Sequence, residues 1–336
     1  MPILNEELHL RDAVAVIFEQ DYEGEIELVL ALGPSRDGTN ELAYALAERE
    51  PRITCVGNPS GSTPDALNAA IAASRYDVVA RVDGHAFIPR SYLRTAVEVL
   101  RRTGADNVGG IMDAQGTSVF GQAVAVAMRS RLGVGNAPFH TGGEEGPADT
   151  VYLGVFRRSA LDRVGGYDRR FARAQDWELN YRIRTSGGLV WFTPDLTVSY
   201  RPRVSVAALA RQYFHYGRWR RVVAGTHGTI SARYLAPPAL VCGLGMSLLV
   251  ASWWPWMLAA PAAYLFAING GGALLGDGLP WRARFLVPLA LATMHLSWGV
   301  GFLTSTSSLT DHREAVASPT APTIESQRAP EGTFAG

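Results

Sequence analysis

The 336-residue sequence predicts an α/β fold with a doubly wound sheet, followed by helices that cross a membrane. Two observations support this prediction. Helical and strand-like periodicities alternate over the first 233 residues, which is typical of a parallel sheet covered by helices. After Arg233 charged residues become rare and long apolar runs dominate, which indicates a change of solvent.

The alternation is clearest between residues 10 and 82. One helical face there carries the apolar residues Leu10, Val14, Ile17 and Phe18. The pattern then predicts a strand at 26–32, a helix at 41–49, a strand at 53–56, a helix at 64–73 that opens with proline, and a strand at 77–82. Ligands bind beyond the carboxyl ends of such strands, in the loops after Leu32, Val56 and Val82.

Charge and cysteine content exclude several classes of protein. Lys+Arg and Asp+Glu both number 31, so the chain lacks the basic excess of a nucleic-acid-binding protein. Cys55 and Cys242 lie far apart and predict neither a disulfide framework nor a cysteine metal site. Glu6, Glu7 and Arg11 stand where a signal peptide would need an apolar run, so we expect the first domain to stay in the cytoplasm.

Three apolar runs, at 237–251, 256–275 and 285–303, each approach or reach the ~20 residues that span a bilayer. Arginines precede the first run and separate the second from the third, which places both groups on the cytoplasmic side. We therefore expect a cytoplasmic domain at 1–233, a multi-pass anchor of about three transmembrane helices in the cell membrane at 234–304, and a disordered external tail at 305–336. Alternatively, the runs form buried core helices or a re-entrant hairpin.

The loop after the strand at 77–82 reads Asp83-Gly84-His85. A carboxylate and an imidazole two residues apart suit Mn²⁺ or Mg²⁺ shared with a diphosphate, because the cation neutralises a phosphate leaving group. The alternative is a plain Asp-Gly turn.

Two further carboxylates lie near predicted helix starts. Asp37, in the loop at 33–39, can help to hold a nucleotide, although Asp-Gly is also a common turn dipeptide. Asp176 can take a proton from an attacking hydroxyl, as an inverting displacement requires, or can act only as a helix N-cap. Further along, residues 211–220 interleave arginines with aromatic residues, which fits either a membrane interface or a sugar diphosphate site.

In their order and spacing these elements resemble family 2 glycosyltransferases of the GT-A fold, most closely the succinoglycan and exopolysaccharide branch. The resemblance covers roughly residues 2–221 and rests on P-I-L-N-E-E at 2–7, D-G-T at 37–39, D-G-H at 83–85, G-G-Y-D at 165–168, Q-D-W-E at 175–178 and the Q-x-x-R-W-like text at 212–219. It implies a nucleotide-sugar donor and a Mn²⁺ or Mg²⁺ cofactor. It also implies roles for three sets of residues: donor binding by Asn5, Glu6, Asp37, Asp83, Arg218 and Trp219; metal ligation by Asp83 and His85; and base catalysis by Asp176.

The sequence departs from the family pattern in two places. Leu32 stands where the family often has an aspartate that reads the uracil, which puts UDP in question. The strand that normally precedes P-x-L-N-E-E is missing before Pro2, so we expect either a start further upstream or a missing central strand, and poor folding of the chain as written. Residues 133–136 and 149–151 are candidate acceptor contacts or structural glycine-rich loops.

The function expected from these observations is an inverting, metal-dependent hexosyl transfer from a nucleotide sugar to a lipid-linked or glycan acceptor in polysaccharide or glycolipid synthesis. Two alternatives remain open at this point. One is a processive polysaccharide synthase, although three short spans are few for a conduit. The other is a non-catalytic, degenerate scaffold, against which the presence of Asp83, His85 and Asp176 argues.

Overall fold

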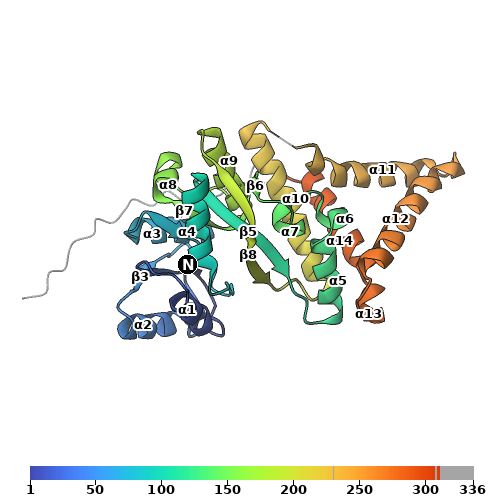
Figure 1. The fold of residues 1–336 in the computed structure, drawn as a ribbon. Helices are drawn as coiled ribbons and strands as arrows, with labels where there is room; N and C mark the ends of the chain where they lie inside the picture. The colour runs from blue at the N-terminus through green and yellow to red at the C-terminus, as the bar shows by residue number, and fades with distance from the viewer. Residues whose placement is uncertain (230, 307–308, 311–336) are drawn as a thin grey trace, which may run out of the picture.

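A computed structural model of the chain describes residues 1–229, 231–306 and 309–310. A region of sheets and helices holds the first two hundred residues, and long helices project from one side of it (Figure 1). The predicted tail at 305–336 lies almost entirely outside the described residues.

The first sheet is parallel and consists of β1 (Pro2–Ile3), β2 (Leu28–Leu32) and β3 (Ile53–Gly57). Its helices are α1 (Leu10–Phe18), α2 (Thr39–Arg49) and α3 (Thr63–Ala73), close to the predicted bounds. Every residue of β2 is buried, and Leu10, Val14 and Ile17 of α1 pack into the same core. The apolar periodicity therefore predicted these elements correctly, apart from β1, which it did not predict.

The second sheet has the strand order β4-β7-β5-β8-β6 and is mixed. β5 and β8 run parallel, whereas β7 is antiparallel to β4 and β5, and β6 is antiparallel to β8. The predicted parallel arrangement thus holds for β1–β3 and for one pair of the second sheet. The strands are β4 (Val78–Ala80), β5 (Asn107–Ala114), β6 (Gly146–Pro147), β7 (Tyr152–Arg157) and β8 (Val190–Tyr200).

The helices of the second sheet cover both of its faces and lead into the C-terminal part. They are α4 (Tyr92–Thr103), α5 (Val119–Met128), α6 (Arg131–Val134), α7 (Pro138–Thr141), α8 (Arg158–Val164) and α9 (Gln175–Thr185). A 22-residue helix, α10 (Val206–His227), then leaves the sheet and packs along α14 (Val287–Leu303).

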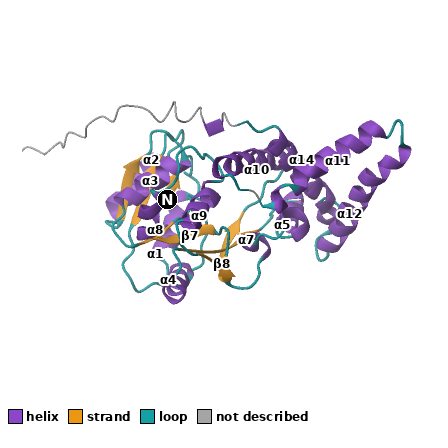
Figure 2. Cartoon of the chain, turned by 90° about the horizontal axis from the view of Figure 1, so that it is seen from above, coloured by secondary structure: helices purple, strands orange, loops and turns teal. Residues whose placement is uncertain are grey.

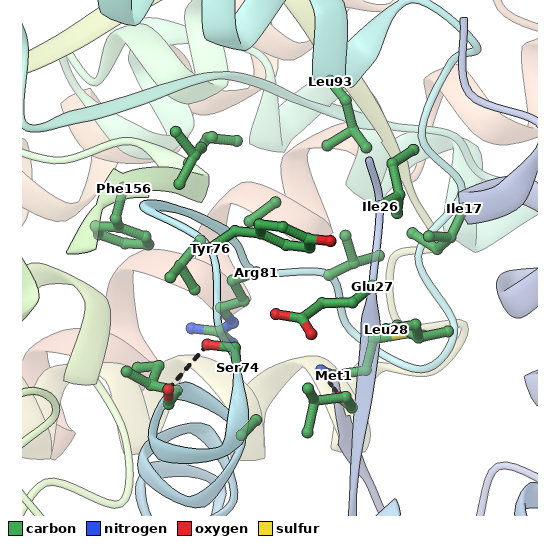
Figure 3. Close-up of a pocket in the computed structure, with 18 of the residues that line it drawn as sticks. Met1, Ile17, Ile26, Glu27, Leu28, Ser74, Tyr76, Arg81, Leu93 and Phe156 are labelled. Atoms are coloured by element: carbon green, nitrogen blue, oxygen red, sulfur yellow. Dashed lines mark hydrogen bonds between the residues drawn. The ribbon is translucent and has the colours of Figure 1, made fainter. Parts of the chain in front are cut away.

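A groove separates the two sheets between β2 and β4. Its cavity measures about 430 Å³ and is lined mainly by apolar side chains. Figure 3 shows Ile26 and Leu28 on one side of it and Phe156 on the other. β1 is only two residues long, and the Met1 amino group at its start donates a hydrogen bond to the Val29 carbonyl oxygen (2.8 Å). β1 therefore pairs with β2 only at Ala31 and Leu32.

The C-terminal part contains three helical segments that are long and apolar enough to cross a membrane: Ala232–Val250, Pro255–Leu275 and Trp281–Leu303. In Figures 1 and 2, α11 and α12 project away from the sheets, whereas α14 lies beside α10 and α5. The elements are η1 (Ala232–Tyr234), α11 (Ala236–Val250), η2 (Pro255–Leu258), α12 (Ala259–Leu275), α13 (Trp281–Arg284) and α14 (Val287–Leu303).

Candidate active site

The loop after β1 and the loop after β2 are locked together by side-chain hydrogen bonds. The Glu6 backbone N–H donates to the Thr39 hydroxyl (2.8 Å), and the Arg36 N–H donates to the Asn5 side-chain oxygen (2.8 Å). Asp37 accepts from the Thr39 hydroxyl, which is the main reason that its pKa is lowered. The predicted residues Asn5, Glu6 and Asp37 therefore meet at the carboxyl edge of the first sheet.

His85 follows β4 and contacts this assembly. Its Nδ1 lies 2.8 Å from Glu6 Oε1. The hydrogen bond to Glu6, together with the charges of Glu6 and Asp83, raises the pKa of His85 against the opposing effects of burial and Arg203. Glu6 thus orients the imidazole, and the second ring nitrogen, Nε2, is left for another partner.

Arg81 joins the other two predicted residues. Its Nε donates to Asp83 Oδ1 (3.0 Å), and its Nη1 donates to Asp176 Oδ1. The Arg81 side chain is only 8% exposed, whereas those of Asp83 and Asp176 are 22% and 40% exposed. One buried cation therefore holds the carboxylate of Asp83, two positions away, and that of Asp176, 95 positions away, both partly exposed to a substrate.

Asp176 lies in the first turn of α9 but does not cap it. The N-cap is Ala174, in the left-handed region at φ 59°, and no side chain caps the helix. Although the side chain is partly exposed, poor solvation of its carboxyl group raises the pKa of Asp176; Arg81 opposes this shift and the Asp83 charge adds to it. The N-cap alternative is therefore not supported, and a carboxylate with a raised pKa is suited to accept a proton.

The residues fit a divalent cation that is completed by its substrate. Among the described residues, no group of three His, Cys, Asp or Glu side chains forms a full ligand set. Asp83 and His85 supply an oxygen and a nitrogen, and Glu6 on the other imidazole nitrogen is the usual partner of a metal-ligating histidine. Diphosphate oxygens would complete such a site.

Arg218 and Trp219 are not brought to this edge. Trp219 is 6% exposed and packs in a core cluster with Phe171, Val222 and Val223. The Arg218 guanidinium lies over the Phe214 ring, 5.7 Å from its centroid. Donor binding by these two residues stays a prediction to which the structure adds no support.

The two candidate acceptor loops have structural partners. Asp149 lies 3.5 Å from both Arg184 and Arg233, and the buried Thr150 hydroxyl accepts a hydrogen bond from Asn180. The Asn136 carbonyl oxygen accepts from Arg233 (2.7 Å). These contacts explain the loops without an acceptor.

Sequence reasoning missed Arg81, the residue that links the site. Its signal was an arginine at the end of an otherwise apolar strand, two residues before a carboxylate. A charge in a buried strand needs a partner of opposite charge. That requirement predicts a contact with Asp83, but not the second contact with Asp176, which depends on the fold.

The comparisons with known proteins identify a glycosyltransferase of the GT-A fold. The Glycosyl transferase family 2 profile matches residues 1–165. The chain is also 33% identical over 320 residues to the succinoglycan biosynthesis protein ExoA of Rhizobium meliloti (strain 1021), covering 94% of this chain and 96% of that protein. The chain belongs to glycosyl transferase family 2.

Solved structures share the fold. The mannosyltransferase PcManGT from Pyrobaculum calidifontis, in complex with GDP-Man and Mn²⁺, aligns over 90% of this chain and 85% of that chain, with a TM-score of 0.58 and 22% identity. Residues 1–349 of S. aureus TarS align over 90% and 89%, with a TM-score of 0.50 and 14% identity. Both confirm the predicted GT-A architecture.

Proposed function

We propose that this glycosyltransferase moves a sugar from a nucleotide diphosphate donor to a lipid-linked or glycan acceptor, with inversion, in exopolysaccharide or glycolipid synthesis. The observation that carries the proposal is the link from Asp83 through Arg81 to Asp176. It holds a candidate metal ligand and a candidate base at a distance that one guanidinium can bridge. Such closeness suits chemistry at a single carbon atom between a leaving diphosphate and an incoming hydroxyl.

Each residue has a definite task in this reaction. Asp83 and Nε2 of His85 would hold Mn²⁺ or Mg²⁺, which when bound neutralises charge on the departing diphosphate. Asp176 accepts the proton of the acceptor hydroxyl. At the same time the hydroxyl oxygen bonds to the anomeric carbon, and the bond from that carbon to the phosphate oxygen breaks, so that the diphosphate leaves. Asn5, Glu6 and Asp37 would line the donor side. The Mn²⁺ in the PcManGT complex supports the choice of metal.

The acceptor class is inferred from the C-terminal helices and the curated relative. Three helical segments could cross a membrane, which would hold the active site beside lipid-linked substrates. The relative is a succinoglycan biosynthesis protein, which supports a role in polysaccharide assembly. We place the catalytic domain on the cytoplasmic side, because arginines cluster where the apolar segments join it.

The test is sugar transfer from a panel of nucleotide sugars by membranes that contain the chain, with lipid extract as acceptor and with or without Mn²⁺. We expect metal-dependent transfer that falls at least ~100-fold in Asp176→Asn and in His85→Ala. Asp162→Asn, an exposed carboxylate on α8, is the matched control and should keep full activity. Equal activity in Asp176→Asn would exclude the proposed base. Folded protein without transfer from any donor would favour the scaffold alternative.

A further inference from the structure

The three apolar C-terminal segments differ in how they meet the rest of the molecule. In the most apolar stretches of Ala232–Val250 and Pro255–Leu275 only 11% of residues are buried, compared with 44% in Trp281–Leu303. Phe266 and Leu274 of α12 are 82% and 80% exposed. Length and composition alone do not distinguish the segments, but packing does.

Helix α14 is attached to the catalytic domain along its whole length. Near its start, Val287, Ala290 and Leu291 are fully buried in a cluster with α5 and α10. In its middle, His295 Nε2 lies 2.8 Å from the Leu132 carbonyl oxygen. Just beyond its end, the Ser305 hydroxyl donates to the Arg218 carbonyl oxygen (2.8 Å). Both ends of α14 therefore lie on the same side, against the catalytic domain.

The outer face of α14 is a single apolar stripe. Leu289, Leu296, Val300 and Leu303 are 37–44% exposed and recur at positions that share one side of a helix. Because the other faces of α14 pack on protein, this stripe is the surface of the helix that lipid can cover. The neighbouring Trp281 and Phe285 are 67% and 76% exposed beside Arg282 and Arg284, a combination typical of that interface.

The α11–α12 hairpin has the opposite character. At 1.5 Å per residue its two segments of 19 and 21 residues are about 28 and 31 Å long, which matches the ~30 Å hydrocarbon core. Its tip carries Trp253, Trp254 and Trp256, which are 60–76% exposed, and residues 251–256 include no charge. Its two ends carry arginines instead. Figure 2 shows the hairpin projecting away from the sheets.

We propose that the lipid bilayer takes up only the α11–α12 hairpin, and that α14 lies along the near interface as the platform on which the catalytic domain sits. The chain then crosses the membrane twice, and its C-terminus returns to the side of the catalytic domain. This replaces the three crossings and external tail expected from composition. The inference rests on the helices and their contacts, and it holds whether or not the proposed sugar transfer is correct.

The test is a pair of reporters on the full-length chain in a bacterial host. Green fluorescent protein fused to Gly336 should fluoresce, and alkaline phosphatase at the same position should be inactive, because residues 304–336 include no further apolar run of spanning length. A fusion after Arg233, before the hairpin, is the matched control for the cytoplasmic side. Active phosphatase at Gly336 would show that α14 also crosses the membrane and would overturn the proposal.

A second measurement tests the hairpin itself. In a background with Cys55 and Cys242 replaced by serine, Ser252→Cys at the tip should react in intact cells with a membrane-impermeant maleimide. Arg52→Cys, on the exposed surface of the catalytic domain, should react only after the cells are opened. A tip cysteine that reacts only in opened cells would show that the hairpin does not cross. Chain that remains soluble as an oligomer without detergent would mean that a second copy, not lipid, covers these helices.

Discussion

At the residue scale, the unusual feature is one buried arginine that serves two carboxylates. The Arg81 side chain is only 8% exposed, and its guanidinium is shared between Asp83 and Asp176. An arginine fork can satisfy two acceptors, whereas a lysine ammonium is a single point of charge. The position of the base relative to the metal ligand therefore depends on a residue that needs no contact with the substrate.

Replacing Arg81 distinguishes positioning from simple electrostatics. Removal of a positive charge beside a cation site would by itself tighten Mn²⁺ binding. If Arg81 fixes the Asp83 carboxylate, Arg81→Gln should instead weaken Mn²⁺ binding by about 10- to 100-fold, the usual effect of losing a group that orients a ligand. Arg81→Lys should bind Mn²⁺ with an affinity between those of the unmodified chain and Arg81→Gln. Titration calorimetry with Mn²⁺ and a nucleoside diphosphate measures the difference.

Stability has to be separated from this effect. Leaving the two carboxylates without their cation can lower the free energy of unfolding by about 3–5 kcal/mol. The folding of Arg81→Gln therefore has to be checked by near-UV circular dichroism. Arg157→Gln is a suitable control, because Arg157 also anchors through buried contacts, to the Leu100 and Ala105 carbonyl oxygens, but away from the site. Tighter or unchanged Mn²⁺ binding in folded Arg81→Gln would rule out positioning.

The sequence singled out Asp83, His85 and Asp176 as candidates because each stands at the end of a strand or the start of a helix, and their roles stay predictions. It did not predict which of them share a partner. Local sequence could not predict the surroundings of Trp219, because aromatic residues beside arginines occur both at ligand sites and in cores; in the structure Trp219 packs against Phe171. The hydrogen bond from Arg81 to Asp176 joins residues 95 positions apart, and a local sequence pattern does not predict a contact at that separation.

At the scale of elements, apolar periodicity predicted where strands and helices occur but not how strands run. The predicted strands at 26–32, 53–56 and 77–82 overlap β2, β3 and β4. β7 enters the sheet antiparallel between β4 and β5, and side-chain alternation is the same in either direction. The direction is set by the connections, which the periodicity does not describe.

The contact between α10 and α14 depends on two glycines. A Cβ at Gly217 would lie 2.0 Å from the Trp298 carbonyl oxygen, and one at Gly301 would lie 2.1 Å from that of Phe214. Gly217→Ala or Gly301→Ala must therefore push the helices apart, at a cost of about 1–3 kcal/mol. Thermal unfolding in detergent should show a lowered midpoint for both.

Gly225 provides the matched control for these substitutions. It lies in the same helix α10, and a Cβ there would have no heavy atom within 4 Å. Gly225→Ala should leave stability unchanged or raise it by up to about 1 kcal/mol, because alanine favours the helix. Equal midpoints for Gly217→Ala, Gly225→Ala and the unmodified chain would show that α10 and α14 do not pack closely in the protein.

At the scale of the whole molecule, the groove between the sheets interrupts what would otherwise be one continuous sheet. Val29 and Ala31 direct their backbone groups to β1, since Val29 O accepts from the Met1 amino group and Ala31 N–H donates to Met1 O. Asp77 and Arg81 pair with the β7 side, so by alternation Val78 and Ala80 turn their backbone groups into the groove. The edges of β2 and β4 thus face each other across a groove that is lined mainly by apolar side chains.

An extended apolar segment joined to Met1 should close this gap. Six residues of valine and isoleucine would continue β1 between β2 and β4 and should raise the unfolding midpoint by at least about 5 °C, because they pair both edges and fill the cavity of about 430 Å³. A Gly/Ser extension of equal length is the control and should leave the midpoint unchanged. Equal midpoints for the two extensions would show that the groove does not accept a strand.

The pH dependence of stability provides an independent check on the same extension. Burial lowers the pKa of the Met1 amino group from 8.0 to about 5, so the folded chain holds this group neutral where the unfolded chain protonates it. Because the unfolded chain takes up this proton below pH 8 and the folded chain only near pH 5, the free energy of unfolding falls by about 1.4 kcal/mol for each pH unit between 8 and 5. An extension that pairs as a strand turns this amine into an amide and should remove that part of the pH dependence. Denaturant unfolding at pH 5.5 and 8 measures the change, and a slope that persists in the apolar extension would mean that the loss of stability arises elsewhere in the molecule.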